Sequence, residues 1–269
     1  MKFVPRTPRD NVNVSDEHPL TEAAILTLGL GIVFAVVAAA IIFFVDLVIM
    51  LVPPKTEARV LESWIPSYFK PPSRDDTRVD ETRALLERLA GHWRDAPYPF
   101  RFEVTDSEDA NAMALPGGLI IVTTGLLDRV ETENELAFIL GHELGHFRNR
   151  DHLRGLGRGV ALTLLLAVIG ASDGASQLGL VVTDLTARGF SREQESDADN
   201  FGLEIVHAEY GHVNQSWRLF DRLLEEAGED GLLVYFSTHP SSDNRIDELK
   251  MYAMRQGWPL DGPTKATGW

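Results

Sequence analysis

The residues best suited to chemistry form one pentapeptide, His142-Glu143-Leu144-Gly145-His146. Histidines four residues apart lie on the same face of a helix, at the separation needed to hold one zinc ion. Glu143 then projects beside the metal, where its carboxylate can take a proton from a water molecule that attacks a peptide carbonyl. The spacing therefore predicts a zinc site with a general base next to it.

The surrounding residues predict that this pentapeptide lies on a buried helix. Thr132 and Glu135 have the spacing of a capping box, and the apolar run from Ala137 to Leu140 leads directly into His142. Two histidines and a glutamate buried together need partners, because an unpaired buried polar group costs several kcal/mol. A solvated helix with incidental histidines is the competing interpretation, and the apolar run argues against it.

A third protein ligand is needed if one coordination position is to stay open for water, and two candidates compete. His152 stands where the metzincin pattern places its third histidine, although Asn149 replaces the glycine of that pattern. The segment SREQESDAD opens another helix and places Glu195 and Asp199 on one face, which suits a ligand and a carboxylate that orients a ligating histidine. A solvated acidic first turn explains that segment equally well, so the spacing leaves the third ligand open.

The elements that must position these residues predict a mainly helical α+β domain with a small sheet. A packing helix is expected around 85–93 and an apolar core helix at Val160–Ile169, which is too short to span a bilayer. Two strands, Phe100–Val104 and Leu119–Thr123, should form a hairpin or lie as neighbours, with a loop between them. Further helices are expected at Glu133–Arg150, Arg192–Glu209, Gln215–Ala227 and Asp243–Arg255.

The N-terminal part carries an uninterrupted apolar run that Pro53 and Pro54 stop. The length of the run predicts one transmembrane helix and exceeds the apolar core of a secretory signal peptide. The basic residues that flank it are too balanced to orient it, and we expect the catalytic domain to lie outside the cytoplasm. The predicted organisation is a tail at 1–22, a transmembrane helix at 23–52, a linker at 53–79, a metalloprotease domain at 80–256 and a tail at 257–269.

Composition narrows the classes of partner and of metal ligand. The chain of 269 residues has 25 Lys and Arg against 40 Asp and Glu, and this net charge of −15 argues against a nucleic-acid partner. It has no cysteine, so that any metal must be held by histidines and carboxylates. Nothing in the composition indicates an oligomeric state.

Four segments together resemble the membrane-associated gluzincins that include the HtpX, CAAX prenyl and Oma-type proteases, family forty-eight of the metallopeptidases. They are NAMALPGG at Asn111–Gly118, the HELGH helix with the Asn-Arg-Asp that ends it, SREQESDAD, and Thr238-His239-Pro240 followed by Arg245, Ile246 and Leu249. The resemblance covers most of the chain from Asp80 to Arg255. It implies one zinc ion per subunit on His142, His146 and Glu195, with Glu143 as base and Asp199 close behind the ligands.

The resemblance also implies roles that spacing alone does not assign. His239 would donate a hydrogen bond to the oxyanion of the tetrahedral intermediate, unless it caps the helix expected near Ser242. Arg245 is expected to pair with the buried carboxylate of Asp199 rather than to touch substrate. The family's substrate edge, on which an extended peptide adds as a strand, is similar to Asn111, Ala112, Met113, Ala114, Leu115, Pro116, Gly117 and Gly118.

The expected function is that of a zinc metalloendopeptidase, anchored in a lipid bilayer through 23–52, that cuts extended or unfolded segments of membrane or envelope proteins. A role in quality control is implied by the resemblance alone. HtpX and the prenyl proteases have several spans, which puts a prenylated substrate in doubt here. The alternatives are a metzincin-type protease that uses His152 and a membrane-tethered zinc-binding chaperone. A segment between Asp173 and Arg188 is expected to cover the cleft.

Overall fold

The computed structural model describes residues 18–61, 78–155, 157, 159, 190–227, 235, 238–240 and 244–267. The predicted core helix at 160–169 and the predicted cover at 173–188 lie outside these residues. The chain divides into two units, Met1–Phe44 and Val45–Trp269, which are treated separately below.

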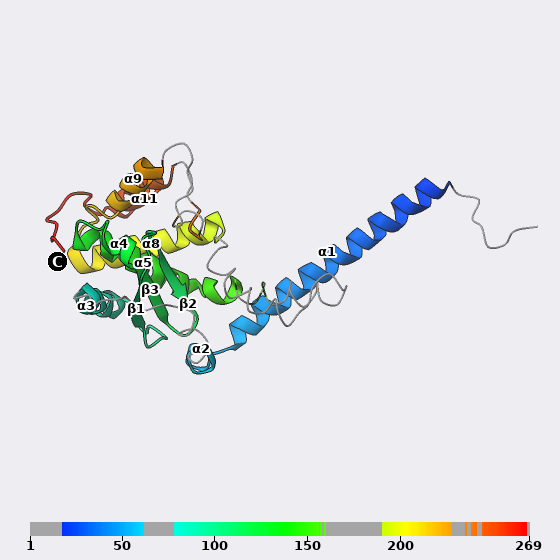
Figure 1. Cartoon of the computed structure of the whole chain (residues 1–269), viewed down its shortest axis with the longest axis horizontal. Coiled ribbons are helices and arrows are strands. Elements are labelled where there is room, and N and C mark those ends of the chain that lie inside the picture. The colour runs from blue at the N-terminus through cyan, green and yellow to red at the C-terminus, as the bar shows by residue number, and fades with distance from the viewer. Residues whose placement is uncertain are drawn as a thin grey trace, which may run out of the picture. The chain divides into compact units, whose positions relative to one another are not determined.

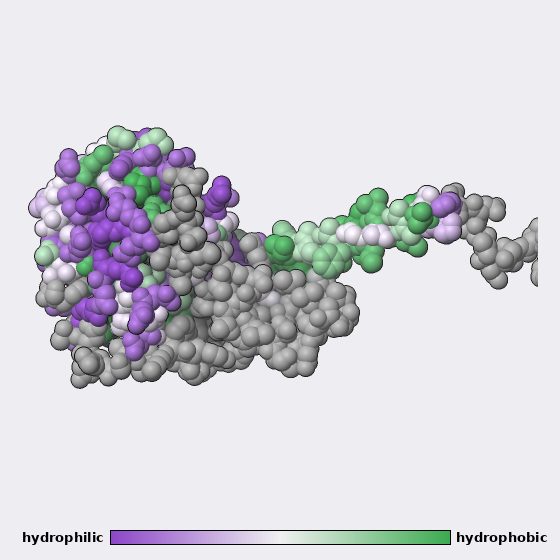
Figure 2. All heavy atoms as spheres, turned by 45° about the horizontal axis from the view of Figure 1, so that its top comes forward, coloured by the Kyte–Doolittle hydropathy of each residue, from purple (hydrophilic) through white to green (hydrophobic). Residues whose placement is uncertain are grey.

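Most of helix α1 (Pro19–Leu51) belongs to the first unit. Among the described residues it is the one helix long and apolar enough to cross a membrane. Its apolar side chains, including Leu30 and Phe43, are exposed along its length, and Figure 2 shows the helix as a largely hydrophobic surface. The helix ends just before Pro53 and Pro54, because proline lacks the N–H that would continue the hydrogen-bond ladder.

The second unit is mainly helical and contains one small sheet, which confirms the predicted fold class (Figure 1). The helices are α2 (Pro54–Leu61), α3 (Arg78–Gly91), α4 (Thr124–Leu127), α5 (Glu133–Asn149), α8 (Arg192–Tyr210), α9 (Arg218–Ala227) and α11 (Arg245–Gln256), and the strands are β1 (Arg101–Thr105), β2 (Ala112–Leu115) and β3 (Leu119–Thr123). Helix α2 stands inside the segment 53–79, which the sequence predicts only as a linker.

The sheet has the order β1-β3-β2. Strand β1 runs parallel to β3, so these two are neighbours and the hairpin alternative is wrong. Strand β2 was expected to be loop, yet it pairs antiparallel with β3 and forms an edge of this sheet. Gly117 and Gly118, with φ of 88° and 81°, make the turn between β2 and β3, a backbone conformation that favours glycine.

Helices α5 and α8 start where the sequence predicts, because both are capped. The Thr132 side chain accepts a hydrogen bond from the Glu135 amide at the start of α5. The Glu135 carboxylate does not complete the box: it accepts from the Glu131 amide at 3.0 Å. Ser191 and Gln194 form a full capping box at the start of α8.

Helices α5 and α8 lie side by side and their backbones touch (Figure 1). A Cβ atom on Gly145 would lie 2.7 Å from the Cα of Ala198, and one on Gly141 would lie 3.0 Å from the Cα of Gly202. Small residues on both helices thus allow a separation that larger side chains would prevent. This close contact brings the HELGH segment of α5 opposite Glu195 of α8.

Candidate metal centre

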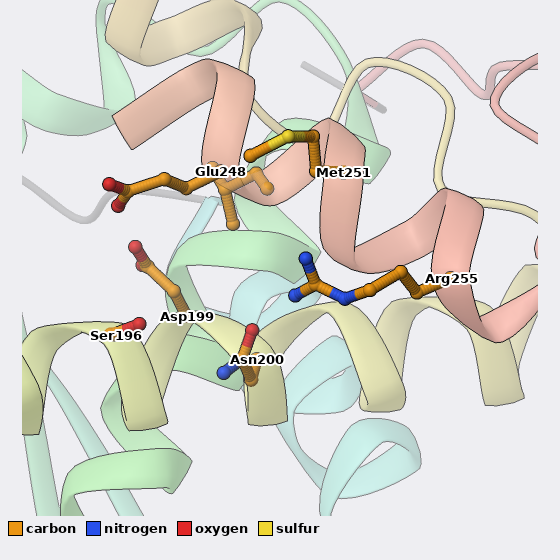
Figure 3. Close-up of a pocket in the computed structure, with 7 residues that line it drawn as sticks. Ser196, Asp199, Asn200, Glu248, Met251 and Arg255 are labelled. Atoms are coloured by element: carbon orange, nitrogen blue, oxygen red, sulfur yellow. The ribbon is translucent and has the colours of Figure 1, made fainter. Parts of the chain in front are cut away.

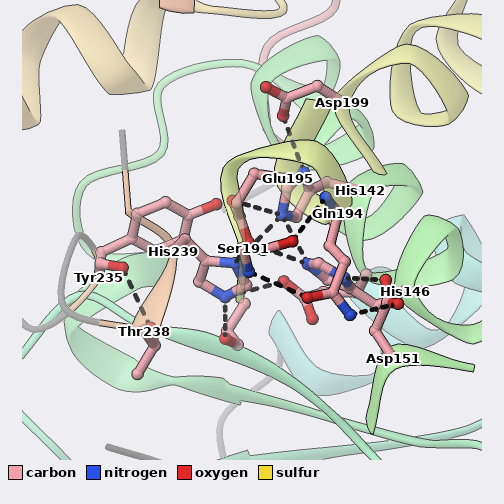
Figure 4. A network of polar contacts seen from close by, with 12 residues as sticks. His142, His146, Asp151, Ser191, Gln194, Glu195, Asp199, Tyr235, Thr238 and His239 are labelled. Carbon is pink, nitrogen blue, oxygen red and sulfur yellow. Dashed lines mark hydrogen bonds and ion pairs between the residues drawn. The ribbon is translucent and has the colours of Figure 1, made fainter. Parts of the chain in front are cut away.

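Four side chains from three segments converge at one buried point (Figure 4). His142 and His146 come from α5, Glu195 comes from α8, and His239 comes from the short Thr-His-Pro segment before α11. One ligand atom from each of the four lies within 4.8 Å of every other. His152 is not among them.

The spacing of these atoms fits a tetrahedral zinc ion. Zinc bonds of about 2.0–2.2 Å place neighbouring ligand atoms about 3.3–3.6 Å apart. The Nε2 atoms of His142 and His146 are 3.1 Å apart, and the Glu195 oxygens lie 3.5 Å from the first and 3.4 Å from the second.

The hydrogen bonds of the imidazoles are compatible with a cation at the same point. The Nδ1 atom of His142 donates to Asp199 at 2.8 Å and that of His146 donates to Asp151 at 3.0 Å, so each Nε2 presents a lone pair. Two lone pairs that face each other repel, unless a proton or a metal ion lies between them. The donor set therefore fits the zinc ion that the sequence predicts.

Electrostatics in the centre also favour a positive charge. Burial lowers the pKa of His142. Burial opposes the charge on His146 as well, but hydrogen bonds with Asp151 and Glu195 outweigh it and raise the pKa of His146 to about 10. Burial raises the pKa of Glu195, and the charges of His239 and His142 reverse this and hold that pKa well below its usual range.

Asp199 and Arg245 stand behind His142. Arg245 donates two hydrogen bonds to Asp199, at 2.8 Å from Nε and 2.7 Å from Nη2, which is the partner expected from the sequence. Burial raises the pKa of Asp199, but the Arg245 charge lowers it below the usual value. Asp199 also lines a hollow of about 130 Å³ between α8 and α11, whose wall includes Ser196 and Glu248 (Figure 3).

Asp151 and Gln194 have a place in the centre that the sequence reasoning missed. Asp151 binds the Nδ1 atom of His146, and Gln194 donates to the other oxygen of Asp151 at 2.6 Å (Figure 4). A ligating histidine commonly donates its second ring N–H to a carboxylate. The acidic residue directly after the end of α5 was the available signal.

Glu143 is fully buried beside the four converging side chains. Neither of its carboxylate oxygens has a hydrogen-bond partner among the residues that the structure describes. The nearest cation-forming group is Nε2 of His239, 3.5 Å from Oε1. A buried carboxylate without partners is costly, so this position has a use other than stability.

His239 faces the centre with one nitrogen and the sheet with the other. Its Nδ1 atom lies 3.1 Å from Nε2 of His142 and 3.1 Å from Oε1 of Glu195. Its Nε2 atom donates to the carbonyl oxygen of Ala112 at 3.3 Å. It does not cap α11, whose N-cap residue is Asn244.

His152, the other candidate for the third ligand, points away from the centre. Its Nε2 atom donates to Oε1 of Glu57 at 2.8 Å. The left-handed residue after α5 is Arg150, with φ of 58°, and Asn149 is still helical, so the chain does not turn where the metzincin pattern requires. The described residues give the metzincin alternative no support.

The predicted substrate edge lies next to the centre. Asn111 Oδ1 accepts a hydrogen bond from Thr238 at 3.2 Å, which joins β2 to the segment that carries His239. The Asn111 carbonyl accepts from the Thr123 amide, so backbone groups face β3 at residue 111 and at every second residue after it. Ala112 and Ala114 therefore direct their N–H and C=O groups away from β3, and those of Ala112 bind Asn111 Oδ1 and His239.

Comparison with known proteins places these features in a family. Residues 76–253 match peptidase family M48. The mitochondrial metalloendopeptidase OMA1 of Danio rerio is 33% identical over 169 residues, 56% of this chain and 35% of that protein. The Bos taurus OMA1 is 29% identical over 209 residues, 70% of this chain and 40% of that protein. The Escherichia coli metalloprotease LoiP is 32% identical over 162 residues, 56% of this chain and 62% of that protein.

The match covers well over half of this chain, although the chain spans less than two thirds of the length of each of these relatives. The matched region contains α5, α8, the small sheet and all four converging side chains. The chain belongs to peptidase family M48.

Proposed function

We propose that the protein is a zinc-dependent metalloendopeptidase. The observation that carries the proposal is the state of Glu143, whose two oxygens are buried without hydrogen-bond partners among the described residues, beside a centre suited to zinc. A zinc site that only stabilises a fold has no use for such a carboxylate, since it costs free energy and binds nothing. A general base needs a free carboxylate at this position.

The chain's own residues divide the work of peptide hydrolysis. His142, His146 and Glu195 would hold the zinc ion, which supplies a Lewis acid that polarises a carbonyl and acidifies water. Glu143 takes the proton of the attacking water on one of its free oxygens and delivers it to the leaving amine. His239 donates from Nε2 to the developing oxyanion.

The substrate in this proposal is an extended polypeptide that pairs with β2. The N–H and C=O of Ala114, which point away from β3, offer main-chain hydrogen bonds to such a segment, whereas those of Ala112 already bind Asn111 Oδ1 and His239. Main-chain hydrogen bonds depend little on the side chains of the substrate, so many sequences should be accepted. The backbone groups of the substrate must be free to pair, so the segment must be unfolded. Strand β2 lies beside His239, so a peptide on this edge runs past the centre.

The natural targets we propose are membrane or envelope proteins, cut in the course of quality control. The length and apolar surface of α1 support its role as a single-pass anchor in a bilayer. We place the catalytic domain outside the cytoplasm, since long domains cross membranes largely regardless of their flanking charges.

The test compares the full-length wild type with Glu143→Gln and Glu195→Ala, by zinc content and by hydrolysis of casein. We expect Glu143→Gln to keep its zinc and to lose cleavage by about a thousandfold or more, and Glu195→Ala to lose both. If Glu143→Gln hydrolyses casein as fast as the wild type, the assignment of Glu143 as the base is wrong. Zinc and activity that survive in Glu195→Ala contradict the assignment of the third ligand.

A second candidate function is that of a membrane-tethered zinc-binding chaperone. The position of His239 favours it: because Nε2 donates to Ala112, Nδ1 presents a lone pair towards Glu195 and qualifies as a fourth ligand. Four protein ligands close a zinc site, as in structural centres. An unchanged cellular phenotype for Glu143→Gln is the result expected of this second candidate and not of the first.

A further inference from the structure

Glu57 is a buried carboxylate on a helix whose neighbouring described residues are mostly exposed. It belongs to α2, which follows α1 after Pro53, and its side chain is 1% exposed while its neighbours Lys55, Thr56 and Arg59 are exposed. Burial of a carboxylate is costly unless charges and hydrogen bonds compensate for it. Its position therefore has to be explained by its partners.

The carboxylate of Glu57 accepts four hydrogen bonds. Oε1 accepts from the backbone N–H of Gly117 and from Nε2 of His152, each at 2.8 Å. Oε2 accepts from the hydroxyl of Tyr98 at 2.8 Å and from Nη2 of Arg150 at 3.1 Å. Burial alone raises the pKa of Glu57, but the hydrogen bond and charge of His152, with the other donors, lower it to about 2. The group is thus a fully satisfied, ionised anchor.

The contact with Gly117 connects this anchor to the proposed substrate edge. Gly117 lies in the turn directly after β2, so its amide helps to determine where the strand ends. The next residue, Gly118, is packed so closely that a Cβ atom would lie 3.1 Å from the Pro99 carbonyl oxygen. The Glu57 contact at Gly117 and the close packing at Gly118 together hold the turn in place. The turn in turn fixes the position of β2 along its own axis, which sets the register of a peptide that pairs with it.

The contact with Arg150 connects the same anchor to α1 and to the metal helix. Through Nη1, Arg150 also donates to the carbonyl oxygens of Ile49 and Val52, both at 2.6 Å, at the C-terminal end of α1, where Pro53 has no N–H to offer the Ile49 carbonyl. Arg150 terminates α5, and the next residue, Asp151, orients His146. Three consecutive residues thus have three different partners: Arg150 binds the end of α1, Asp151 binds His146, and His152 binds Glu57.

We propose that Glu57 is a positioning residue for the substrate: from the helix that follows the apolar α1, it holds the β2–β3 turn through the Gly117 amide and so aligns the peptide that pairs with β2. This inference rests on the proposed function. An anchor that served only to attach α2 would need the Arg150 and Tyr98 contacts but not the one with the turn. Docking of α2 thereby completes the substrate edge.

The experiment measures binding of fluorescein-labelled casein to full-length, zinc-loaded protein in detergent micelles, in the non-cleaving Glu143→Gln background. We expect Glu57→Ala to raise the Kd about tenfold, the effect of losing one well-placed hydrogen bond, with zinc content unchanged. Tyr98→Phe is the matched control, because it removes a hydrogen bond to the same carboxylate, keeps the ring and leaves Gly117 in contact with Glu57. It should leave the Kd unchanged.

Equal Kd values for Glu57→Ala and its parent overturn the inference, and so does an equal loss of affinity in Tyr98→Phe. If the Glu143→Gln parent binds no casein, the proposed function and the inference both fail. That result differs from equal Kd values in parent and Glu57→Ala, which overturn the inference alone. Where Glu57→Ala does not fold, Glu57→Gln replaces it. The charged Arg150 then attracts the single remaining oxygen and the amide N–H groups face Gly117, so the same tenfold rise is expected.

Discussion

At the scale of the single residue, the two ring nitrogens of His239 face different groups. Its Nδ1 atom approaches the zinc ligands, while Nε2 lies between the Ala112 carbonyl and Glu143. Tyr235 stacks on the ring with centroids 4.8 Å apart, which holds its orientation. A fixed imidazole beside the base can act on charge that develops during the reaction.

We predict that His239→Ala keeps its zinc and loses about a hundred- to a thousandfold in kcat, the usual effect of removing one oxyanion donor. Zinc content by elemental analysis and kcat on a fluorogenic peptide are the measurements. Loss of the metal in this variant would identify His239 as a fourth ligand and favour the closed, structural site.

Asp151 and Asp199 contact the histidines proposed as zinc ligands, and through these contacts we expect them to affect zinc affinity. We predict that Asp151→Asn weakens zinc binding about 10- to 100-fold, because the amide no longer accepts strongly from Nδ1 of His146. Competition with a chelator gives the affinity. Asp197→Asn is the matched control, since Asp197 is an exposed carboxylate on α8, and it should leave the affinity unchanged. A similar affinity for both variants contradicts a role for Asp151.

At the scale of elements, the contact between α5 and α8 sets the distances within the metal centre. A Cβ atom on Gly145 would meet the backbone of Ala198, with 2.7 Å to its Cα and 2.9 Å to its carbonyl oxygen, so the helices would have to separate. Two of the proposed ligands and Glu143 are on α5 and the third ligand is on α8, so that separation also moves Glu195 away from the histidines.

We predict that Gly145→Ala destabilises the protein by about 1–3 kcal/mol and weakens zinc binding, despite the higher helix propensity of alanine. Urea unfolding of the full chain in micelles measures the first effect. Gly91→Ala is the control: Gly91 is helical with nothing within 4 Å of the added Cβ, so stability should stay the same or rise by up to about 1 kcal/mol. Equal stability of the two variants would show that the helices adjust without cost.

The elements that the sequence predicted are those whose signals are local. Helices α5 and α8 have caps and apolar stripes, and their predicted ends lie within one residue of the observed ones. Strand β2 was missed because its four residues, Ala112 to Leu115, contain no β-branched or aromatic side chain and depend on β3 for pairing. Helix α2 was missed because it is short and its anchor, Glu57, finds its partners far along the chain.

The candidate site divides in the same way. The pentapeptide and the capped segment around Glu195 are visible as spacing, but the residues left a choice between Glu195 and His152, and only resemblance decided it. The structure adds contacts that favour Glu195: the close α5–α8 contact brings Glu195 to the histidines, while Glu57 binds His152. Neither contact can be read from sequence, because each depends on tertiary packing.

At the scale of the whole molecule, the metal centre is surrounded by a hydrophobic core of apolar side chains that are not proposed ligands. Phe138, Leu140 and Leu144 of α5 and Leu203 of α8 are fully buried around it. Because this packing can stabilise both helices independently of an ion, we expect the domain to differ from small zinc proteins that unfold without metal.

We therefore predict that chelation of zinc leaves the far-ultraviolet circular dichroism spectrum unchanged while the protein unfolds at a lower temperature. The difference should correspond to about 4 kcal/mol at free zinc near 1,000 times the Kd, and added zinc should restore it. Loss of the helical signal on chelation would instead show that the ion is needed for folding.

The proposed pairing of substrates with β2 has a consequence for which proteins are cut. A segment can pair with this edge only when its own backbone groups are free, so within a folded target it must first leave its native structure. Cleavage then follows the fraction of time that the segment is open, and each additional 1.4 kcal/mol or so of opening free energy lowers that fraction about tenfold. If substrates pair with β2 as proposed, the selective property of a target is its local thermodynamic stability: we expect a loosened copy of a protein to be cut and a well-folded copy of identical sequence to survive.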